Sequence, residues 1–245
     1  MTTVEGLYDR KVRCPLCEET YNTKKVLTRA VKIVETQGDF FARYGGPNPV
    51  HYLINVCSTC GFSFLEKTQP KVTSLRRQSY VDEVATRWAT RDLTGVRTLK
   101  QGITSFKLAI FCAQFVGEPS RTIGGLCLHL AWLYRESGDR ENERRFMQNA
   151  LDFYIDCYEH DSRLDDEGKM PYLIGELARR LGDDKLAVLY FNQVIQDRNA
   201  AQKYVKLARN QWAILREDRE NKGLKEINED GEESESQGHA KVANA

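Results

Sequence analysis

Two stretches of the sequence decide the fold, Cys14-Pro15-Leu16-Cys17 and Cys57-Ser58-Thr59-Cys60-Gly61. In each, two cysteines are separated by two residues, so a tight turn points both thiolates at one centre. Two such turns supply four soft ligands at about 2.3 Å, the set that tetrahedral zinc needs. The spacing therefore predicts one zinc ion per chain, with these ligands: Cys14, Cys17, Cys57 and Cys60.

Four protein thiolates leave no coordination position open for water, which favours a structural zinc over a catalytic one. A redox switch, in which oxidation of the cysteine pairs releases the metal, is the alternative. His51 lies close to Cys57 in sequence, but the four cysteines already complete the shell. We therefore expect an ordinary strand-edge histidine at this position.

Short apolar segments flank the cysteine pairs and predict strands that enter and leave the two turns. They are Lys11–Arg13, Tyr52–Val56 and Phe62–Phe64. The long segment between the pairs carries aliphatic residues from Val26 to Val34, which predict a further strand that extends the same small sheet. A loop rich in glycine and proline follows, Tyr44-Gly45-Gly46-Pro47-Asn48-Pro49. We expect it to be a rigid connection that directs the chain toward the second cysteine pair. The alternative is that it binds a ligand.

The composition is that of a folded protein with room for a core. The chain has 245 residues, 41% of them hydrophobic, and a net charge of +1, which predicts two domains plus tails. We expect neither a signal peptide nor a membrane span, and a cytoplasmic location. The three further cysteines, Cys112, Cys127 and Cys157, are expected to be small buried hydrophobes.

Residues 67–107 form a basic stretch. It contains nine basic and three acidic residues, a net charge of +6, with Tyr80 and Trp88 among them. Such a stretch could contact nucleic-acid phosphates. We instead favour a solvated linker helix whose charge is offset by the acidic end of the chain.

From Leu99 onward, apolar residues recur at three- and four-residue spacing and predict successive helices. Two helical hairpins can be superimposed in sequence. Leu130-Ala131, Tyr134, Gly138 and Ala150 match residues 44 positions later, Ile174-Gly175, Ala178, Gly182 and Val194. This pattern resembles the tetratricopeptide repeat, in which two packed helices carry small residues at their closest approach.

Together these features predict an α+β protein, a zinc-ribbon-like β module followed by an all-α tetratricopeptide-like domain. The predicted segments are a zinc module at 1–66, a basic linker or helix at 67–98, a helical domain at 99–219 and a disordered acidic tail at 220–245. The tail contains too few apolar residues to order itself.

The joint arrangement of CPxC, the Tyr44–Pro49 loop, the second CxxC-Gly and the helical half resembles a bacterial family, domain of unknown function 2225. The likeness covers roughly residues 5 to 215. It implies the zinc knuckles and the repeat-like helices. It implies no activity, substrate or partner.

The preferred function is an interaction scaffold whose helical groove binds a protein or peptide. A nucleic-acid-associated zinc ribbon and a thiol/zinc redox sensor are the alternatives. An enzyme is disfavoured because GxSxG, P-loop, GxGxxG and HExxH motifs are missing. The candidates for partner contact are expected to be exposed: His129, Trp132, Arg135, Glu176 and Arg179.

Overall fold

The computed structural model describes residues 6–68, 70–160 and 167–217. They fall into two compact units, residues 1–164 and 165–245, each of which is described by itself. The predicted segment boundaries near residues 66 and 98 both lie inside the first unit. The predicted acidic tail lies outside the described residues.

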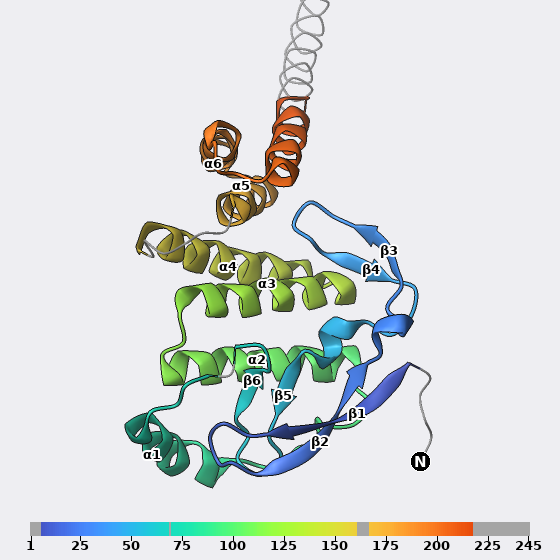
Figure 1. Cartoon of the computed structure of the whole chain (residues 1–245), viewed down its shortest axis with the longest axis vertical. Helices are drawn as coiled ribbons and strands as arrows, with labels where there is room; N and C mark the ends of the chain where they lie inside the picture. Colours follow the sequence, from blue (N-terminus) through green and yellow to red (C-terminus); the bar gives the residue numbers. More distant parts are fainter. Residues whose placement is uncertain (1–5, 69, 161–166, 218–245) are drawn as a thin grey trace, which may run out of the picture. The chain divides into compact units, whose positions relative to one another are not determined.

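Two short antiparallel hairpins carry the cysteine turns (Figure 1). β1 (Leu7–Arg13) pairs with β2 (Thr20–Val26), and β5 (Ile54–Val56) pairs with β6 (Ser63–Leu65). Each cysteine pair occupies the connection of its hairpin, as the flanking apolar segments predict. All three residues of β5 are buried. A 3₁₀ turn, η2 (Pro49–Tyr52), leads into β5.

The segment between the two cysteine turns forms a hairpin of its own. β3 (Ile33–Thr36) pairs with β4 (Ala42–Tyr44) in a separate sheet, so the prediction that this strand extends the cysteine hairpins is wrong. Val26 ends β2, and a 3₁₀ turn, η1 (Thr28–Ala30), intervenes. Ile33 and Val34 are 61% and 71% exposed, so the aliphatic residues of β3 add little to the core.

Residues 67–98, predicted to be a basic linker or helix, contain a short helix with one buried side chain. Thr73 caps α1 (Ser74–Glu83) by accepting a hydrogen bond from the Arg76 backbone N–H. Tyr80 of this helix is 1% exposed. A 3₁₀ turn, η3 (Ala85–Arg87), follows. Most basic side chains of this segment face solvent, whereas Tyr80, Val72, Val84 and Ala85 pack against the core of the first unit.

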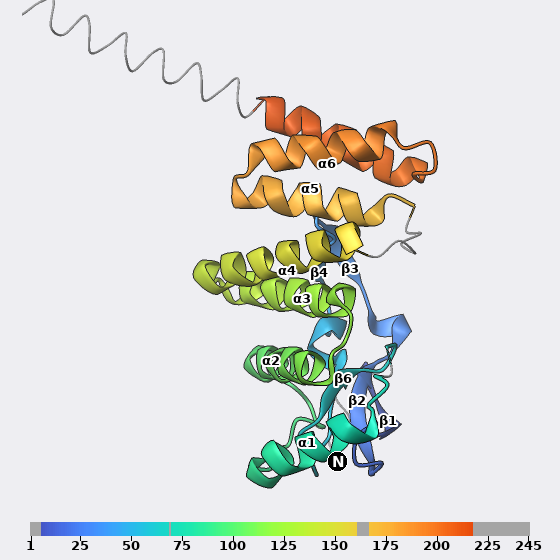
Figure 2. The same cartoon turned by 90° about the vertical axis from the view of Figure 1, so that its left-hand side faces the viewer.

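Three long helices complete the first unit: α2 (Leu99–Val116), α3 (Ser120–Ser137) and α4 (Arg140–His160). α2 begins in a capping box and lies against β5 and β6 (Figure 2). Cys112 on α2 accepts a hydrogen bond from the Ser63 backbone N–H at 3.3 Å. α3 and α4 pack along each other as an antiparallel pair (Figures 1 and 2).

The second unit is helical throughout its described part. It contains α5 (Lys169–Leu181), α6 (Asp184–Gln196) and a further helix over residues 202–217. Gly175 lets α5 and α6 approach closely, because a Cβ at this position would lie 2.7 Å from the ring of Phe191. None of the helices in the described ranges is both long and apolar enough to span a bilayer.

The two helical hairpins share their turn geometry at the offset of 44 residues. Gly138 and Gly182 end α3 and α5 with positive φ, at 77° and 89°. The aspartate after each glycine then caps the next helix: Asp139 accepts from Asn142 N–H and Asp183 from Leu186 N–H, both at 3.0 Å. These local matches accord with the predicted repeat, which stays a prediction at the level of the whole helical half.

Candidate metal centre

The two cysteine turns have the same backbone hydrogen bonds. The first cysteine of each turn donates its N–H to the carbonyl five residues later, Cys14 to Glu19 at 2.9 Å and Cys57 to Phe62 at 3.0 Å. Its carbonyl accepts from the residue after the second cysteine, Glu18 or Gly61. That residue has positive φ in both turns, 66° and 74°. The two turns are therefore equivalent metal-binding knuckles.

The four sulfurs converge on one point. Cys14 Sγ lies 3.7 Å from Cys60 Sγ, Cys17 Sγ lies 3.6 Å from Cys57 Sγ, and all four lie within 4.8 Å of one another. A tetrahedron with metal–sulfur bonds of about 2.3 Å has sulfur–sulfur edges of about 3.8 Å. The predicted ligands thus fit a tetrahedral metal such as zinc, and the fit does not itself identify the metal.

The thiols strongly perturb one another. Hydrogen bonds from Cys14 and Cys60 lower the pKa of Cys57. The hydrogen bond with Cys57 raises the pKa of Cys14, and the bond with Cys14 raises that of Cys60. A bound divalent cation would stabilise the thiolates of all four cysteines and displace their protons.

An apolar shell encloses the sulfurs. Phe62 and Phe64 stack at 6.1 Å, and Tyr80 of α1 meets Phe62 edge-on at 5.3 Å. The Tyr80 hydroxyl lies 3.5 Å from Cys112 Sγ of α2. This shell ties the cysteine hairpins to α1 and α2 in one core, whose buried members are Val12, Cys14, Leu16, Cys57, Cys60, Phe62, Phe64, Tyr80 and Cys112.

Two side chains from residues 67–98 bind the knuckle backbones directly. Arg77 Nη2 donates to Pro15 O at 3.1 Å, and Trp88 Nε1 donates to Ser58 O at 3.0 Å. The Trp88 ring also covers Gly61, where a Cβ would lie 2.5 Å from ring carbons. This role of the segment was not predicted from the sequence. The charge of the segment suggested an exposed surface. The two aromatic residues Tyr80 and Trp88 were the only indication in the sequence that part of the segment packs against the core, and their spacing fits no regular pattern.

Buried Arg97 and half-buried Lys25 hold the backbone that leads into the second knuckle. Arg97 Nη1 donates to His51 O at 3.0 Å and to Ile54 O at 2.8 Å. Lys25 Nζ donates to Tyr52 O at 2.8 Å and to Leu53 O at 3.4 Å. Four successive carbonyls are thereby bound by cations. Arg97 is 5% exposed. Although it adds to the positive charge of residues 67–107, it therefore has a structural role and does not belong to an exposed basic surface.

His51 is directed away from the sulfur cluster. Its Nε2 lies 3.1 Å from Glu136 Oε2, which also accepts from Asn48 Nδ2 at 2.8 Å. The Gly-Pro loop is thereby fastened to α3. A hollow of about 320 Å³ lies between the loop and α3, lined by Phe41, Ala42, Arg43, Tyr44, Gly46, Asn48, Arg135 and Glu136.

The partner candidates on α3 make contacts within the first unit. Arg135 Nη2 donates to Asp39 Oδ2 at 2.8 Å, and its Nε donates to Glu143 Oε1 at 2.6 Å. Trp132 Nε1 donates to the same Asp39 Oδ2 at 3.1 Å. Half-buried His129 stacks on Phe106 at 5.8 Å. The expectation of exposed side chains is wrong here, because the β3–β4 hairpin lies against α3 and its Asp39 is fully buried.

The candidates on α5 form an ion cluster. Glu176 is fully buried rather than exposed. It accepts from Arg179 Nε at 2.8 Å and from Arg180 Nε at 2.6 Å. Contact between any of these residues and a partner stays a prediction. The three remaining cysteines, Cys112, Cys127 and Cys157, are buried as predicted.

Comparison with models of protein families shows to which family the chain belongs. A family model described as an uncharacterized protein conserved in bacteria (DUF2225) matches residues 7–215. The chain belongs to the DUF2225 family. The match confirms the resemblance and spans both the cysteine module and the helices of this DUF2225 chain. Comparisons with curated proteins and with solved structures gave no match.

We expect elemental analysis of the purified chain to find one zinc per molecule. Cys57→Ser removes a ligand and should lose most of that zinc, whereas Cys127→Ser, at a buried cysteine outside the cluster, should keep it. Because Tyr80 and Cys112 belong to the metal core, chelation should speed hydrogen exchange in α1 and α2 as well as in the hairpins. A full zinc equivalent in Cys57→Ser would contradict the ligand set.

Gly61→Ala should lower the free energy of unfolding by about 2–5 kcal/mol. The substitution combines positive-φ strain of about 1–2 kcal/mol with overpacking against Trp88 of about 1–3 kcal/mol. Gly117→Ala is the matched control, since Gly117 has φ 76° and a Cβ added there would have no atom within 4 Å. Equal losses in urea unfolding of the two variants would show that Trp88 does not press on this knuckle.

Arg135→Met should lower the free energy of unfolding by about 3–5 kcal/mol, because it leaves Asp39 buried without its cation. Arg43→Met, which removes an exposed pair with Glu35 at 3.7 Å, should cost less than about 1 kcal/mol. Denaturant titrations measure both. A loss in Arg135→Met as small as that in Arg43→Met would mean that the hairpin is not anchored through Asp39.

Proposed function

We propose that this DUF2225 chain is a cytoplasmic, non-catalytic protein-binding protein whose β module is held together by one structural zinc. The observation that carries the proposal is the closed four-cysteine cluster, in which three of the sulfurs belong to buried residues and the fourth to a half-buried one. Four thiolates complete a tetrahedral shell and leave no position for substrate or water. Such a centre stabilises a surface rather than performing a reaction.

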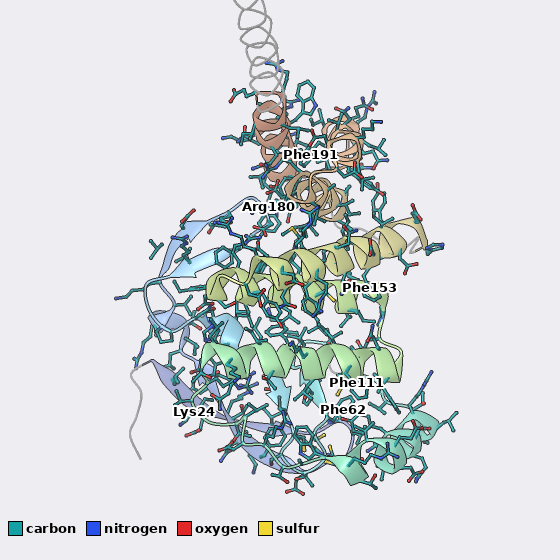
Figure 3. The ribbon with its side chains drawn as sticks, turned by 180° about the vertical axis from the view of Figure 1, so that it is seen from behind. Lys24, Phe62, Phe111, Phe153, Arg180 and Phe191 are labelled. Atoms are coloured by element: carbon teal, nitrogen blue, oxygen red, sulfur yellow. The ribbon has the colours of Figure 1, made fainter. Side chains whose placement is uncertain are left out.

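The helices attached to the metal core offer the best-supported surface for a protein partner. Leu75 on α1 is 77% exposed and Phe111 on α2 is 46% exposed. Phe111 is labelled in Figure 3. Aromatic side chains such as Phe111 are enriched at the apolar centre of protein interfaces. The same two helices place Tyr80 and Cys112 against the metal core. The surface is therefore expected to depend on the metal, whereas the α3 candidates Trp132 and Arg135 already have internal partners.

Nucleic-acid binding is the second candidate. Its support is the group of exposed basic residues Lys67, Lys71, Arg76, Arg87 and Arg91. The two aromatic residues that could stack on bases are less suited to it, because Tyr80 is buried and Trp88 covers Gly61. Only charge would then recognise the nucleic acid, and binding would weaken steeply with salt.

Site-specific photo-crosslinking in cells distinguishes the two candidates. A benzophenone amino acid replaces Leu75 or Phe111, and Val34 is the control, since it is 71% exposed but lies on β3. We expect Leu75 and Phe111 to capture the same protein and Val34 not to capture it. Crosslinks to nucleic acid, abolished by Arg76→Glu with Arg87→Glu, would favour the second candidate. Equal capture at all three positions would contradict the proposed surface.

A further inference from the structure

The glycine- and proline-rich loop over residues 44–49 borders the hollow of about 320 Å³. Three segments of the first unit line this hollow: residues 41–44 at the end of the β3–β4 hairpin, the loop itself, and the last turn of α3. Small-molecule sites have volumes of about 300–1,000 Å³. The hollow is therefore large enough for a small ligand, and its lining decides which kind.

Glu136 lines this hollow with a carboxylate of which one oxygen is bound by two neighbours. Oε2 accepts from Asn48 Nδ2 at 2.8 Å and lies 3.1 Å from His51 Nε2. Asn48 is itself fixed, because its Oδ1 accepts from the Val50 N–H at 2.9 Å. Oε1 makes no hydrogen bond within the described ranges. The loop therefore holds the carboxylate in place and leaves its second oxygen for a ligand.

The two arginines that line the hollow already have carboxylate partners. Arg135 donates to Asp39 at 2.8 Å and to Glu143 at 2.6 Å. Arg43 Nε lies 3.7 Å from Glu35 Oε2. An anionic ligand would have to compete with these three carboxylates for the two arginines, so the lining disfavours a negatively charged ligand.

Glu136, in contrast, has no lysine or arginine partner in the part of the chain that the structure describes. Its one ion-pair neighbour there is His51, and a neutral histidine can donate the proton of Nε2. The rings of Phe41 and Tyr44 line the same hollow. The lining thus combines a carboxylate oxygen without a hydrogen bond and two aromatic walls, which together suit a positively charged group on an alkyl chain.

We propose that the hollow binds a primary amine whose ammonium group donates to Glu136 Oε1. A single available oxygen suits an ammonium group, which is a compact point charge. A guanidinium group suits it less, because its planar fork pairs with both oxygens of a carboxylate. The amine is either a free alkylamine or the side chain of a lysine in a protein. The site lies on other elements than Leu75 and Phe111 and is independent of the proposed protein-binding surface.

Nuclear magnetic resonance of the isotope-labelled, zinc-loaded full chain tests the site through the indole N–H signals of its three tryptophans. Trp132 reports on the site, because it lines a smaller hollow together with Phe41 and Glu136. Trp88 and Trp212 are internal controls. n-Butylammonium chloride is compared with sodium chloride at equal ionic strength. We expect butylammonium alone to shift the Trp132 signal in a saturable way and to leave the two controls unchanged. If Trp132 responds to both salts alike, the proposal fails.

Glu136→Gln is the decisive variant, since it removes the charge and keeps the size of the side chain. It should weaken butylammonium binding about three- to tenfold. Glu141→Gln makes the same change at an exposed carboxylate on α4 and should leave the affinity as it is in the wild-type chain. Wild-type affinity in Glu136→Gln would contradict the proposal. If Glu136→Gln does not fold, n-butylguanidinium is titrated into the wild-type chain, and binding as tight as that of butylammonium would overturn the assignment of an amine.

Two short peptides, blocked at both termini, distinguish the sources of the amine. One contains a central lysine, and the other has norleucine at the same position. A Trp132 shift with the lysine peptide alone supports the side chain of a protein as the ligand. A shift with butylammonium and with neither peptide supports a free amine. A shift of equal size with both peptides would show that the charge of the ammonium group does not matter and would refute the site.

Discussion

The structure of the first unit depends on bringing four cysteine sulfurs to within 4.8 Å of one another from two turns some forty residues apart. Two-stranded hairpins of this size are not stable alone, and sulfur ligands gain their stability only when a metal joins them. The apolar shell of Phe62, Tyr80 and Cys112 excludes water from the same point. The four cysteines and the apolar side chains of α1 and α2 therefore share one core, in which a metal would bind.

Buried charges position the remaining parts of this unit. Arg97 and Lys25 bind the carbonyls of residues 51–54, where β5 begins. Arg135 binds Asp39 at the turn of the β3–β4 hairpin. A guanidinium or an ammonium group removed from water has to find fixed partners, because leaving it unpaired is costly. Each of these cations consequently restricts the positions of the backbone and side-chain groups that bind it. The hairpin and the loop before the second knuckle are therefore held by polar contacts as well as by the buried side chains of Phe41, Val50 and Tyr52.

In the helical half, the sequence predicts where helices end and where the next ones begin. Gly138 and Gly182 end helices, and Asp139 and Asp183 start the next ones, as their positions in the matched hairpins predict. Cap and turn geometry depends on residues a few positions apart, so a linear pattern contains most of it. The exposure of Trp132, Arg135 and Glu176 was wrongly predicted, because a helical pattern does not say which face another segment covers.

The sequence by itself determined which four cysteines come together, the strands beside them and the ends of the helices, since each depends on short-range spacing and on side-chain chemistry. Only the tertiary structure decided which polar and aromatic residues are available. Tyr80, Trp88 and Arg97 read as an exposed basic surface, yet they contact the knuckles and the carbonyls before β5. The physical reason is that burial arises from contacts between segments that are distant in the chain. Such contacts produce no periodic pattern in the sequence of either segment.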